Sequence, residues 1–540
     1  MTNFIDGDSS SLSLAEINKE WFSVDKTASF LNVPSGGVIH IIGICGIAMA
    51  QLALSLVKQG YIVSGSDTHF YDPMGGLLQS SSITLFDKYE KDNIPQEVDL
   101  VVIANAMFPD NPEVNLIREK NLPYSSFPLV MGEWLIGKRH SIVICGTHGK
   151  TTTTGIAASI LFQMKKDPSW FIGGLSGSLP ETLHQGTGDF SVIEGDEYHT
   201  AFYAKRPKFF FYKPQTVIIN AIEFDHGDIY KDVAAICFEF KELLMSLQSC
   251  DKAICCIDYP EVRKLLAEIK DEVKCKILTF GTKDVLQKLS INEIAHKLDT
   301  VKAAHKLDVV KAHHELPMSV EYLITNRKQC GTSQVVTVSG LAFENPLEFT
   351  LPMIGSYNAL NAVAAISALS ENGILVKEIV STLAEIKGVS RRQQILFEND
   401  DYVLIEDFAH HPTAVKKTVL AVAEAYPDRR IWAVFEPRSN TSRRKVFEED
   451  YKSGFEKAAQ VIICNVTSNS RMNDDIELID VNDLAESISQ RGTCARALPD
   501  SDSIYSCIAE EVEPGDLILI MSNGDFGHIC KRLTACFSNK

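Results

Sequence analysis

The segment Gly146-Thr-His-Gly-Lys-Thr-Thr-Thr-Thr154 has the residue types and spacing of a loop that binds phosphate. It follows an apolar run at residues 141–145 that indicates a strand, and it opens a segment of helical character, as such a loop requires. Its glycines let backbone N–H groups approach phosphate oxygens, and the helix N-terminus adds partial positive charge. Lys150 is expected to reach the terminal phosphates of a nucleotide, and Thr151 to offer its hydroxyl to Mg²⁺. Because Ile144 stands where the general pattern has its first glycine, the loop is a shortened variant.

Two acidic segments follow apolar strands and supply candidate metal ligands. Glu194 lies in the run Ile193-Glu-Gly-Asp-Glu197, and Glu223, Asp225 and His226 follow a second apolar run. The carboxyl ends of parallel strands meet at one edge of a sheet, where ligands bind in such folds. Carboxylate oxygens and an imidazole beside a phosphate loop suit Mg²⁺. Ordinary charged strand ends are the alternative.

A glycine turn, Ile42-Gly43-Ile-Cys-Gly46-Ile-Ala-Met49, lies between a predicted strand and a predicted helix. It departs from the dinucleotide-binding pattern GxGxxG, because Cys45 and Ala48 stand at the second and third glycine positions. Asp67 follows at the distance where that pattern has its acidic residue. The expected ligand is a nucleotide diphosphate, and a tight turn without a ligand is the alternative.

A fourth segment, Gly355-Ser-Tyr-Asn358-Ala-Leu-Asn361, places two asparagines three residues apart, on one face of a predicted helix. Their amides can hydrogen-bond the edge of an adenine base. Capping of the helix N-terminus is the alternative, and the spacing does not choose between the two.

The composition is that of a globular protein with several cores. The chain has 540 residues, of which 45% are hydrophobic and 23% charged, so two to four domains are expected. Its 52 basic and 70 acidic residues leave a formal net charge of −18, which argues against nucleic acid as a partner. The 13 cysteines include several in apolar runs, which favours reduced thiols in a cytoplasmic protein. No basic secretory signal begins the chain, and glycines interrupt residues 38–57, the best candidate for a membrane span.

Predicted strands alternate with predicted helices, and this pattern restarts at residues 38, 141 and 402. We therefore expect an α/β protein of three domains after a polar extension at residues 1–37. Residues 38–139 are expected to be Rossmann-like, residues 140–395 to form a parallel sheet of the phosphate-loop ATPase type, and residues 396–540 to be Rossmann-like again. Residues 295–303 are nearly repeated at 304–312, which indicates a solvated helical insertion near residues 280–316.

Taken together, these segments resemble the Mur ligase family, the ATP-dependent amide-forming enzymes of peptidoglycan synthesis. The resemblance extends over residues 38–535. Its most specific marks are Gly146-Thr-His-Gly-Lys-Thr-Thr-Thr153, Glu223-Phe-Asp-His226, the segment with Asn358 and Asn361, Gly388-Val-Ser-Arg-Arg392 and Glu406-Asp-Phe-Ala-His-His-Pro412.

The resemblance implies roles for residues in each segment. The expected catalytic residues are Lys150, Glu194, His226 and Arg392, and the expected Mg²⁺ ligands are Thr151, Glu194 and His226. ATP is expected to contact Gly146, Thr147, His148, Gly149, Lys150, Thr151, Thr152, Asn358, Asn361, Arg391, Arg392 and Asp407, with the asparagines at adenine and Asp407 at the ribose. The UDP end of a muramate substrate is expected to contact Gly43, Ile44, Cys45, Gly46, Met49 and Asp67.

Two stretches near the C-terminus narrow the resemblance to one branch of the family. Ala433-Val-Phe-Glu-Pro-Arg-Ser-Asn-Thr441 and Met521-Ser-Asn-Gly-Asp-Phe-Gly527 resemble the branch that joins UDP-N-acetylmuramate to the murein tripeptide L-alanyl-γ-D-glutamyl-meso-diaminopimelate. Arg438 is expected to bind a carboxylate of diaminopimelate, because a guanidinium matches a carboxylate bidentately, and Asn440 is expected beside it. The branch that adds L-alanine is one alternative, and a nucleotide-binding regulator without activity is another.

The chain departs from the family at two positions. Some members carry a carbamylated lysine where Phe240 stands here, and although Lys241 follows it, we do not expect carbamylation. Tyr357 replaces a frequent histidine before Asn358.

Overall fold

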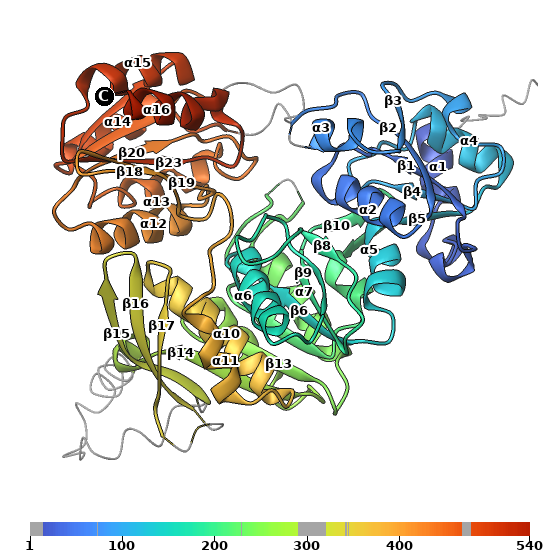
Figure 1. Cartoon of the computed structure of the whole chain (residues 1–540), viewed down its shortest axis with the longest axis horizontal. Coiled ribbons are helices and arrows are strands. Elements are labelled where there is room, and N and C mark those ends of the chain that lie inside the picture. The colour runs from blue at the N-terminus through green and yellow to red at the C-terminus, as the bar shows by residue number, and fades with distance from the viewer. Residues whose placement is uncertain are drawn as a thin grey trace, which may run out of the picture.

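The computed structural model describes residues 14–539 except 73, 228, 290–319, 341, 342, 344 and 467–476. Three α/β units follow one another along the chain, each with its own large sheet. In Figure 1 the N-terminal unit (blue) and the C-terminal unit (orange and red) lie above the central unit (green and yellow). The expected α/β fold of three domains is confirmed, whereas the repeat at residues 295–312 lies outside the described residues.

The N-terminal unit is a parallel sheet with the strand order β3-β2-β1-β4-β5. The order reverses at β1, as in the Rossmann fold, so the turn after β1 lies at the switch point where ligands bind. The central strand is buried on both faces, which explains its unbroken apolar run. The elements are α1 (Leu14–Trp21), β1 (Val38–Ile42), α2 (Ile47–Lys58), β2 (Ile62–Ser66), α3 (Met74–Gln79), β3 (Thr84–Phe86), β4 (Leu100–Ile103), α4 (Pro112–Lys120), β5 (Tyr124–Ser126) and α5 (Phe127–Val130).

The described part of the expected extension, residues 14–37, packs against this unit. Phe22 is 2% exposed and Phe30 is 3% exposed, so both belong to apolar cores. The Asn18 side chain donates to Asn115 Oδ1 of α4 at 2.7 Å, and the Phe30 N–H donates to Glu133 Oε2 at 2.6 Å. These residues are therefore part of the folded N-terminal unit.

The central unit is a ten-stranded sheet with the order β17-β16-β15-β14-β13-β12-β6-β9-β7-β8. The strands from β15 to β7 run parallel, as expected, but β8, β16 and β17 are antiparallel to their neighbours, so the whole sheet is mixed. Strand β14 ends at Thr282, so the first residues of the expected insertion belong to the sheet. The strands are β6 (His140–Cys145), β7 (Ser169–Phe171), β8 (Leu183–His184), β9 (Phe190–Gly195), β12 (Thr216–Ile219), β13 (Lys252–Cys256), β14 (Lys276–Thr282), β15 (Tyr322–Cys330), β16 (Ser333–Gly340) and β17 (Leu347–Leu351).

The helices of this unit cover the sheet, and a separate hairpin projects from it (Figure 1). The hairpin consists of β10 (His199–Ala201) and β11 (Ala204–Pro207). The helices are α6 (Lys150–Gln163), the short 3₁₀ helix η5 (Lys208–Tyr212), α7 (Val233–Ser246), α8 (Pro260–Ile269), α10 (Ser356–Glu371) and α11 (Val376–Leu383).

The C-terminal unit is a six-stranded sheet with the order β18-β19-β23-β20-β21-β22, in which only the edge strand β18 is antiparallel. Its buried strand β23 is apolar after its first residue and has apolar clusters on both faces. The elements are β18 (Gln394–Glu398), β19 (Tyr402–Asp407), α12 (Pro412–Ala425), β20 (Arg430–Phe435), α13 (Glu448–Lys452), β21 (Gln460–Cys464), α14 (Val481–Gln490), β22 (Cys494–Leu498), α15 (Ser501–Glu511), β23 (Asp516–Met521) and α16 (Ile529–Ser538).

Strand pairing brings the candidate functional segments together. Strand β6 pairs in parallel with both β9 and β12, so their carboxyl ends lie side by side. The loops that leave these three strands carry the phosphate-loop segment and the two acidic segments. The phosphate loop and the two acidic segments therefore meet at one edge of the sheet.

Candidate active site

The phosphate loop is clamped between β12 and α10. Gly146 has a φ of +119°, and a Cβ there would lie 2.7 Å from the carbonyl oxygen of Ala221. Gly149 has a φ of +80°, and a Cβ there would lie 2.5 Å from Asn361 Oδ1. The Thr147 N–H donates to Ala221 O at 2.9 Å, which closes the loop onto the exit of β12. Helix α6 begins directly after Gly149, so its free N–H groups point into the loop.

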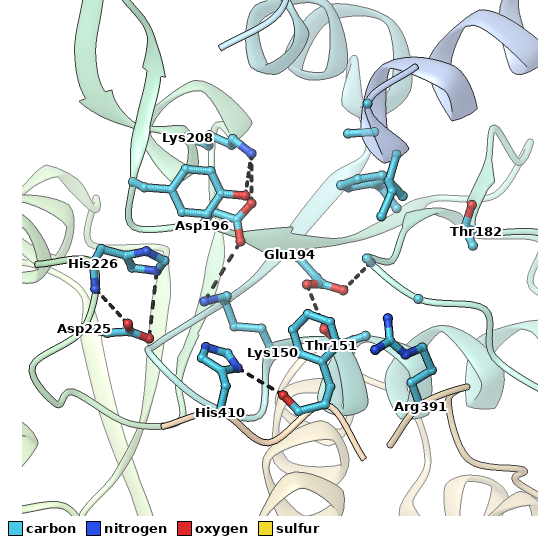
Figure 2. Close-up of a pocket in the computed structure, with 18 of the residues that line it drawn as sticks. Lys150, Thr151, Thr182, Glu194, Asp196, Lys208, Asp225, His226, Arg391 and His410 are labelled. Carbon is cyan, nitrogen blue, oxygen red and sulfur yellow. Dashed lines mark hydrogen bonds and ion pairs between the residues drawn. The ribbon is translucent and has the colours of Figure 1, made fainter. Parts of the chain in front are cut away.

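Lys150 is held by carboxylates at the edge of the sheet (Figure 2). Its Nζ donates to Gly146 O at 2.8 Å and to Glu197 Oε2 at 2.7 Å, and it lies 3.9 Å from Asp196 Oδ1. Burial opposes the charged form, but the negative charges of Glu197 and Asp196 outweigh it and raise the pKa of Lys150. The ammonium group is therefore charged and positioned close to the phosphate loop.

Thr151 and Glu194 form the first group of possible metal ligands. Thr151 Oγ1 donates to Glu194 Oε2 at 3.1 Å, and the Gly173 N–H donates to Glu194 Oε1 at 2.5 Å. Burial and the negative charge of Asp196 raise the pKa of Glu194 to about 7. A cation at this carboxylate would offset both effects, so these hard oxygen donors fit Mg²⁺.

His226 belongs to a second group, with Glu197 and Asp225. Its Nε2 lies 3.0 Å from Glu197 Oε1, and the ligand-capable atoms of the three residues all lie within 4.8 Å of one another. Glu197 is 0% exposed and contacts both His226 and Lys150. His226 thus groups with Glu197 and Asp225, and it lines one cavity with Thr151 and Glu194, the other expected Mg²⁺ ligands. The oxygen-rich second group also fits a divalent cation.

A third group joins the phosphate loop to the C-terminal unit. His148 Nε2 lies 2.7 Å from Glu223 Oε2, and Thr413 Oγ1 of α12 donates to Glu223 Oε1 at 2.8 Å. The His148 and His411 rings are 4.6 Å apart, and His411 Nε2 contacts Phe224 O at 3.1 Å. Burial and the charge of His148 lower the pKa of His411 to about 4, so its ring is neutral near pH 7. This group ties the C-terminal unit to the central unit beside the phosphate loop.

The two neighbouring arginines have different environments. Arg391 donates to Glu406 Oε1 at 2.8 Å and to Ser522 O at 2.9 Å, so it is anchored within the C-terminal unit. Arg392 Nη2 approaches Thr151 Oγ1 at 3.4 Å, and its guanidinium lies 4.7 Å from the centre of the Phe408 ring. Arg392 is therefore the arginine directed at the phosphate loop.

The expected base-binding residues form a connected set. Asn361 Nδ2 donates to Asn358 Oδ1 at 3.1 Å, and Asn358 Nδ2 donates to Gln393 Oε1 at 2.9 Å. The carboxylate of Asp407 accepts from the N–H groups of Gln393 at 2.8 Å and Ala409 at 2.7 Å. Helix α10 and strand β19 thus bring the asparagine pair and Asp407 to one side of the cavity.

The glycine turn of the N-terminal unit uses Asp67 to stabilise itself. Gly43 has a φ of +80°, and the Cys45 N–H donates to Asp67 Oδ2 at 2.9 Å. Asp67 Oδ1 accepts from the Thr68 N–H at 2.8 Å and from Tyr89 Oη at 3.3 Å. Gly46 precedes α2 and leaves the N-terminus of that helix facing the cavity, which suits a diphosphate.

One cavity of about 1500 Å³ joins the three units. The expected residues that line it are Gly43, Gly46, Met49, Asp67, Thr147, His148, Gly149, Lys150, Thr151, Thr152, Glu194, His226, Asn358, Asn361, Arg391, Arg392 and Asp407. Five others do not line it, namely Ile44, Cys45, Gly146, Arg438 and Asn440. Of these, Arg438 and Asn440 are exposed after β20, where the Arg438 guanidinium lies against Gly524. Lys241 also lies elsewhere, at the surface, and its Nζ donates to Glu268 at 2.6 Å.

Several residues of this site have no role predicted from the sequence. Asp196 and Glu197 follow Glu194 within the same acidic run, and that run is the sequence feature that could have identified them as site residues. His410 lies in the Glu406-Asp-Phe-Ala-His-His-Pro412 segment and lines the cavity. Lys208 and Tyr198 also line the cavity, but no motif marks them.

Among the described residues, no helix is long and apolar enough to cross a membrane. None of the 13 cysteines, all of which are described, forms a disulfide.

Three family models match the chain in succession. They are the catalytic domain of the Mur ligase family at residues 38–139, the Mur ligase middle domain at residues 144–369 and the Mur ligase glutamate ligase domain at residues 391–524.

Two curated relatives match almost the whole chain. The UDP-N-acetylmuramate–L-alanyl-γ-D-glutamyl-meso-2,6-diaminoheptandioate ligase of Escherichia coli (strain K12) is 32% identical, over 92% of this chain and 97% of that protein. The UDP-N-acetylmuramate–L-alanine ligase of Desulfitobacterium hafniense is 28% identical, over 90% of this chain and 97% of that protein.

Two solved structures are similar to nearly the whole chain. A murein peptide ligase from Psychrobacter arcticus has a TM-score of 0.64 and 28% identity, and covers 94% of this chain and 99% of its own. A UDP-N-acetylmuramate–alanine ligase from Thermotoga maritima has a TM-score of 0.70 and 22% identity, over 93% of this chain and 99% of its own, and shows the likeness of the fold.

Proposed function

The chain belongs to the Mur ligase family, and from that premise we propose that it joins UDP-N-acetylmuramate to the tripeptide L-alanyl-γ-D-glutamyl-meso-diaminopimelate. Mur ligases are ATP-dependent enzymes that form amide bonds and use Mg²⁺. The observation that carries the proposal is the single cavity that joins the glycine turn of the N-terminal unit, the phosphate loop and the C-terminal unit. A ligase of this kind has to bring a sugar nucleotide, ATP and an amine together.

The proposed reaction has two steps. A carboxylate oxygen of the muramyl lactyl group attacks the γ-phosphorus of ATP, and ADP leaves, which forms an acyl phosphate. The neutral amine of the tripeptide then attacks the acyl carbon, inorganic phosphate leaves, and the amine loses a proton. Activation is needed because a carboxylate does not condense with an amine in water.

The residues of the cavity act mainly by neutralising charge and by positioning. The carboxylate and the γ-phosphate repel each other, so Lys150 and Arg392 are assigned to the phosphate oxygens, where fixed cations stabilise the transferring group. Holding the two reactants side by side can lower the barrier by about 7–11 kcal/mol. When bound at the Thr151–Glu194 and His226 groups, Mg²⁺ would neutralise further phosphate charge.

His410 is suited to accept the proton of the amine. Burial lowers the pKa of His410, so the ring is neutral near pH 7. Its Nδ1 contacts Phe408 O at 3.0 Å, and donation from Nδ1 leaves Nε2 with a lone pair. His410 lines the cavity beside the phosphate loop, as Figure 2 shows.

The C-terminal unit offers a separate place for the peptide arm. The exposed Arg438 lies against Gly524, whose N–H donates to Ser522 Oγ at 2.9 Å. Ser522 Oγ also donates to Glu436, so the loop that supports the guanidinium is held by its own hydrogen bonds. This arrangement supports Arg438 as the group that binds a carboxylate of diaminopimelate.

A coupled assay of ADP release tests the proposal. UDP-N-acetylmuramate, ATP and Mg²⁺ are supplied with either the tripeptide or L-alanine as the amine. Turnover with the tripeptide and little with L-alanine is the expected result. Turnover with L-alanine alone would assign the chain to the alanine-adding branch, and nucleotide binding without turnover would indicate a regulator.

A further inference from the structure

Lys208 is a buried ammonium group at the cavity wall that none of the roles above uses. The residue is 7% exposed and lines the cavity. Its Nζ donates to Asp196 Oδ2 at 3.0 Å and to Tyr198 Oη at 2.9 Å. No other described residue accepts a hydrogen bond from Nζ, which leaves its third N–H bond available to a ligand in the cavity.

Lys208 lies next to the place where phosphoryl transfer is proposed. Asp196 Oδ2 contacts Lys208, and Asp196 Oδ1 lies 3.9 Å from Lys150 Nζ. Figure 2 shows Asp196 between the two lysines. A single carboxylate therefore separates the ammonium group of Lys208 from that of the phosphate-loop lysine.

The hairpin that precedes Lys208 connects it to the N-terminal unit. Strands β10 and β11 lie between Tyr198 and Lys208, and the tip of the hairpin packs against buried aromatic rings of the N-terminal unit. The Tyr203 ring lies 5.8 Å from that of Phe22 and 5.5 Å from that of Tyr124. The position of Lys208 is thus set by the unit proposed to bind the sugar nucleotide as well as by the central unit.

The carboxylate of the sugar nucleotide needs a cation beside it where it meets the phosphate loop. The sugar nucleotide, bound at the glycine turn, must extend its carboxylate through the shared cavity to the phosphate loop. The carboxylate arrives beside the triphosphate, so its negative charge is unfavourable there unless a donor pairs with it. Lysine suits this role because its compact ammonium group can contact a protein carboxylate and a ligand at once.

We propose that Lys208 binds the lactyl carboxylate of the sugar nucleotide and holds it beside the terminal phosphate of ATP. This assignment rests on the proposed function and adds a substrate-binding residue to it. Asp196 and Tyr198 orient the ammonium group, and the carboxylate of the substrate takes its remaining N–H bond.

Binding measurements with two sugar nucleotides test the assignment. UDP-N-acetylglucosamine shares the nucleotide and the amino sugar but lacks the lactyl carboxylate. Calorimetry with a non-hydrolysable ATP analogue and Mg²⁺ present compares the two ligands on the wild type, Lys208→Met, and the control Lys205→Met, which alters an exposed lysine of the same hairpin.

Loss of one charge-assisted hydrogen bond should weaken binding of UDP-N-acetylmuramate to Lys208→Met by about 10- to 100-fold. Binding of UDP-N-acetylglucosamine and of the ATP analogue should stay unchanged, and the control should match the wild type. A preference for the carboxylate-bearing ligand that survives in Lys208→Met overturns the assignment. An equal loss for both sugar nucleotides also overturns it, because Lys208 would then serve the structure alone.

Lys208→Met could fail to fold, and loss of ATP-analogue binding would reveal this. A second pair of variants tests the assignment in that case. Lys208→Arg keeps the cation, and Lys208→Gln removes it while keeping hydrogen-bond donors. The carboxylate preference should persist in Lys208→Arg and fall in Lys208→Gln, and an equal preference in both would refute the role. ADP release by the wild type with the tripeptide is measured on the same preparation, so failure of the proposed function is seen separately.

Discussion

Substitution of Gly149 by alanine tests the clamped phosphate loop. Gly149 has a φ of +80°, where an L-residue is less stable by roughly 1–2 kcal/mol. The new Cβ would also lie 2.5 Å from Asn361 Oδ1 and 2.9 Å from Asn220 Nδ2, which is too close for either amide to stay in place.

The energetic cost of displacing the Asn361 and Asn220 amides follows from the hydrogen bonds that they make. Asn361 Nδ2 donates to Asn358 at 3.1 Å, and Asn220 Nδ2 donates to Thr153 Oγ1 at 2.8 Å. Disturbing a buried hydrogen bond costs about 1–3 kcal/mol. We therefore expect Gly149→Ala to lower the free energy of unfolding by about 3–8 kcal/mol, and to weaken ATP binding by at least about tenfold because the N–H groups of the loop shift.

Gly373→Ala is the matched control. Gly373 has a φ of +84°, but no atom lies within 4 Å of the Cβ that would be added. The free energy of unfolding of Gly373→Ala should fall only by the conformational strain of roughly 1–2 kcal/mol, and its affinity for ATP should stay unchanged. Urea unfolding and calorimetric titration of an ATP analogue are measured on both variants. Equal destabilisation, or unaltered ATP affinity in Gly149→Ala, would refute the clamped-loop interpretation.

Four further perturbations test the site. Lys150→Met should lower kcat by about 10²–10³-fold with the circular dichroism spectrum retained, and undiminished ADP release would contradict the phosphate-loop assignment. Thr441→Val removes the hydroxyl that donates to Asp225 Oδ1 at 2.5 Å across the contact of the central and C-terminal units, so kcat should fall while the KM for ATP changes little. The pKa of His411 is about 4 in the folded protein and 6.5 ordinarily, so the folded state keeps the ring neutral where the unfolded chain would protonate it. The free energy of unfolding is therefore higher above pH 6.5, and this contribution, at most roughly 3 kcal/mol, is lost as the pH falls toward 4. His411→Asn, which cannot titrate, should flatten that dependence in urea unfolding at pH 7 and pH 5, and an unchanged slope would count against it. Chelation of Mg²⁺ should stop ADP release and re-addition should restore it, whereas turnover in excess chelator would exclude the metal role.

Local patterns in the chain were sufficient to predict many of the elements around the site. Apolar runs predicted strands at residues 38–42, 141–145 and 402–407, and β1, β6 and β19 confirm them. Such runs are easy to recognise in the sequence, because parallel strands are buried on both faces and are therefore apolar throughout. Helix α12 begins at Pro412, and proline in its first turn after a capping residue is a start signal that the sequence contains. The antiparallel strands β16 and β17 were missed, because alternating burial in a meander is a weaker signal.

The sequence by itself determined the family, the phosphate loop and the strand-end carboxylates, because each is encoded by residues close together in the chain. Only the tertiary structure decided which residues share a space. It grouped His226 with Glu197 and Asp225, directed Arg392 rather than Arg391 at the phosphate loop, and placed Arg438 outside the main cavity. It also brought Lys208 to Asp196 across a hairpin that no motif marks. The physical reason is that side-chain contacts and burial depend on how distant segments pack, and spacing along the chain does not record that packing.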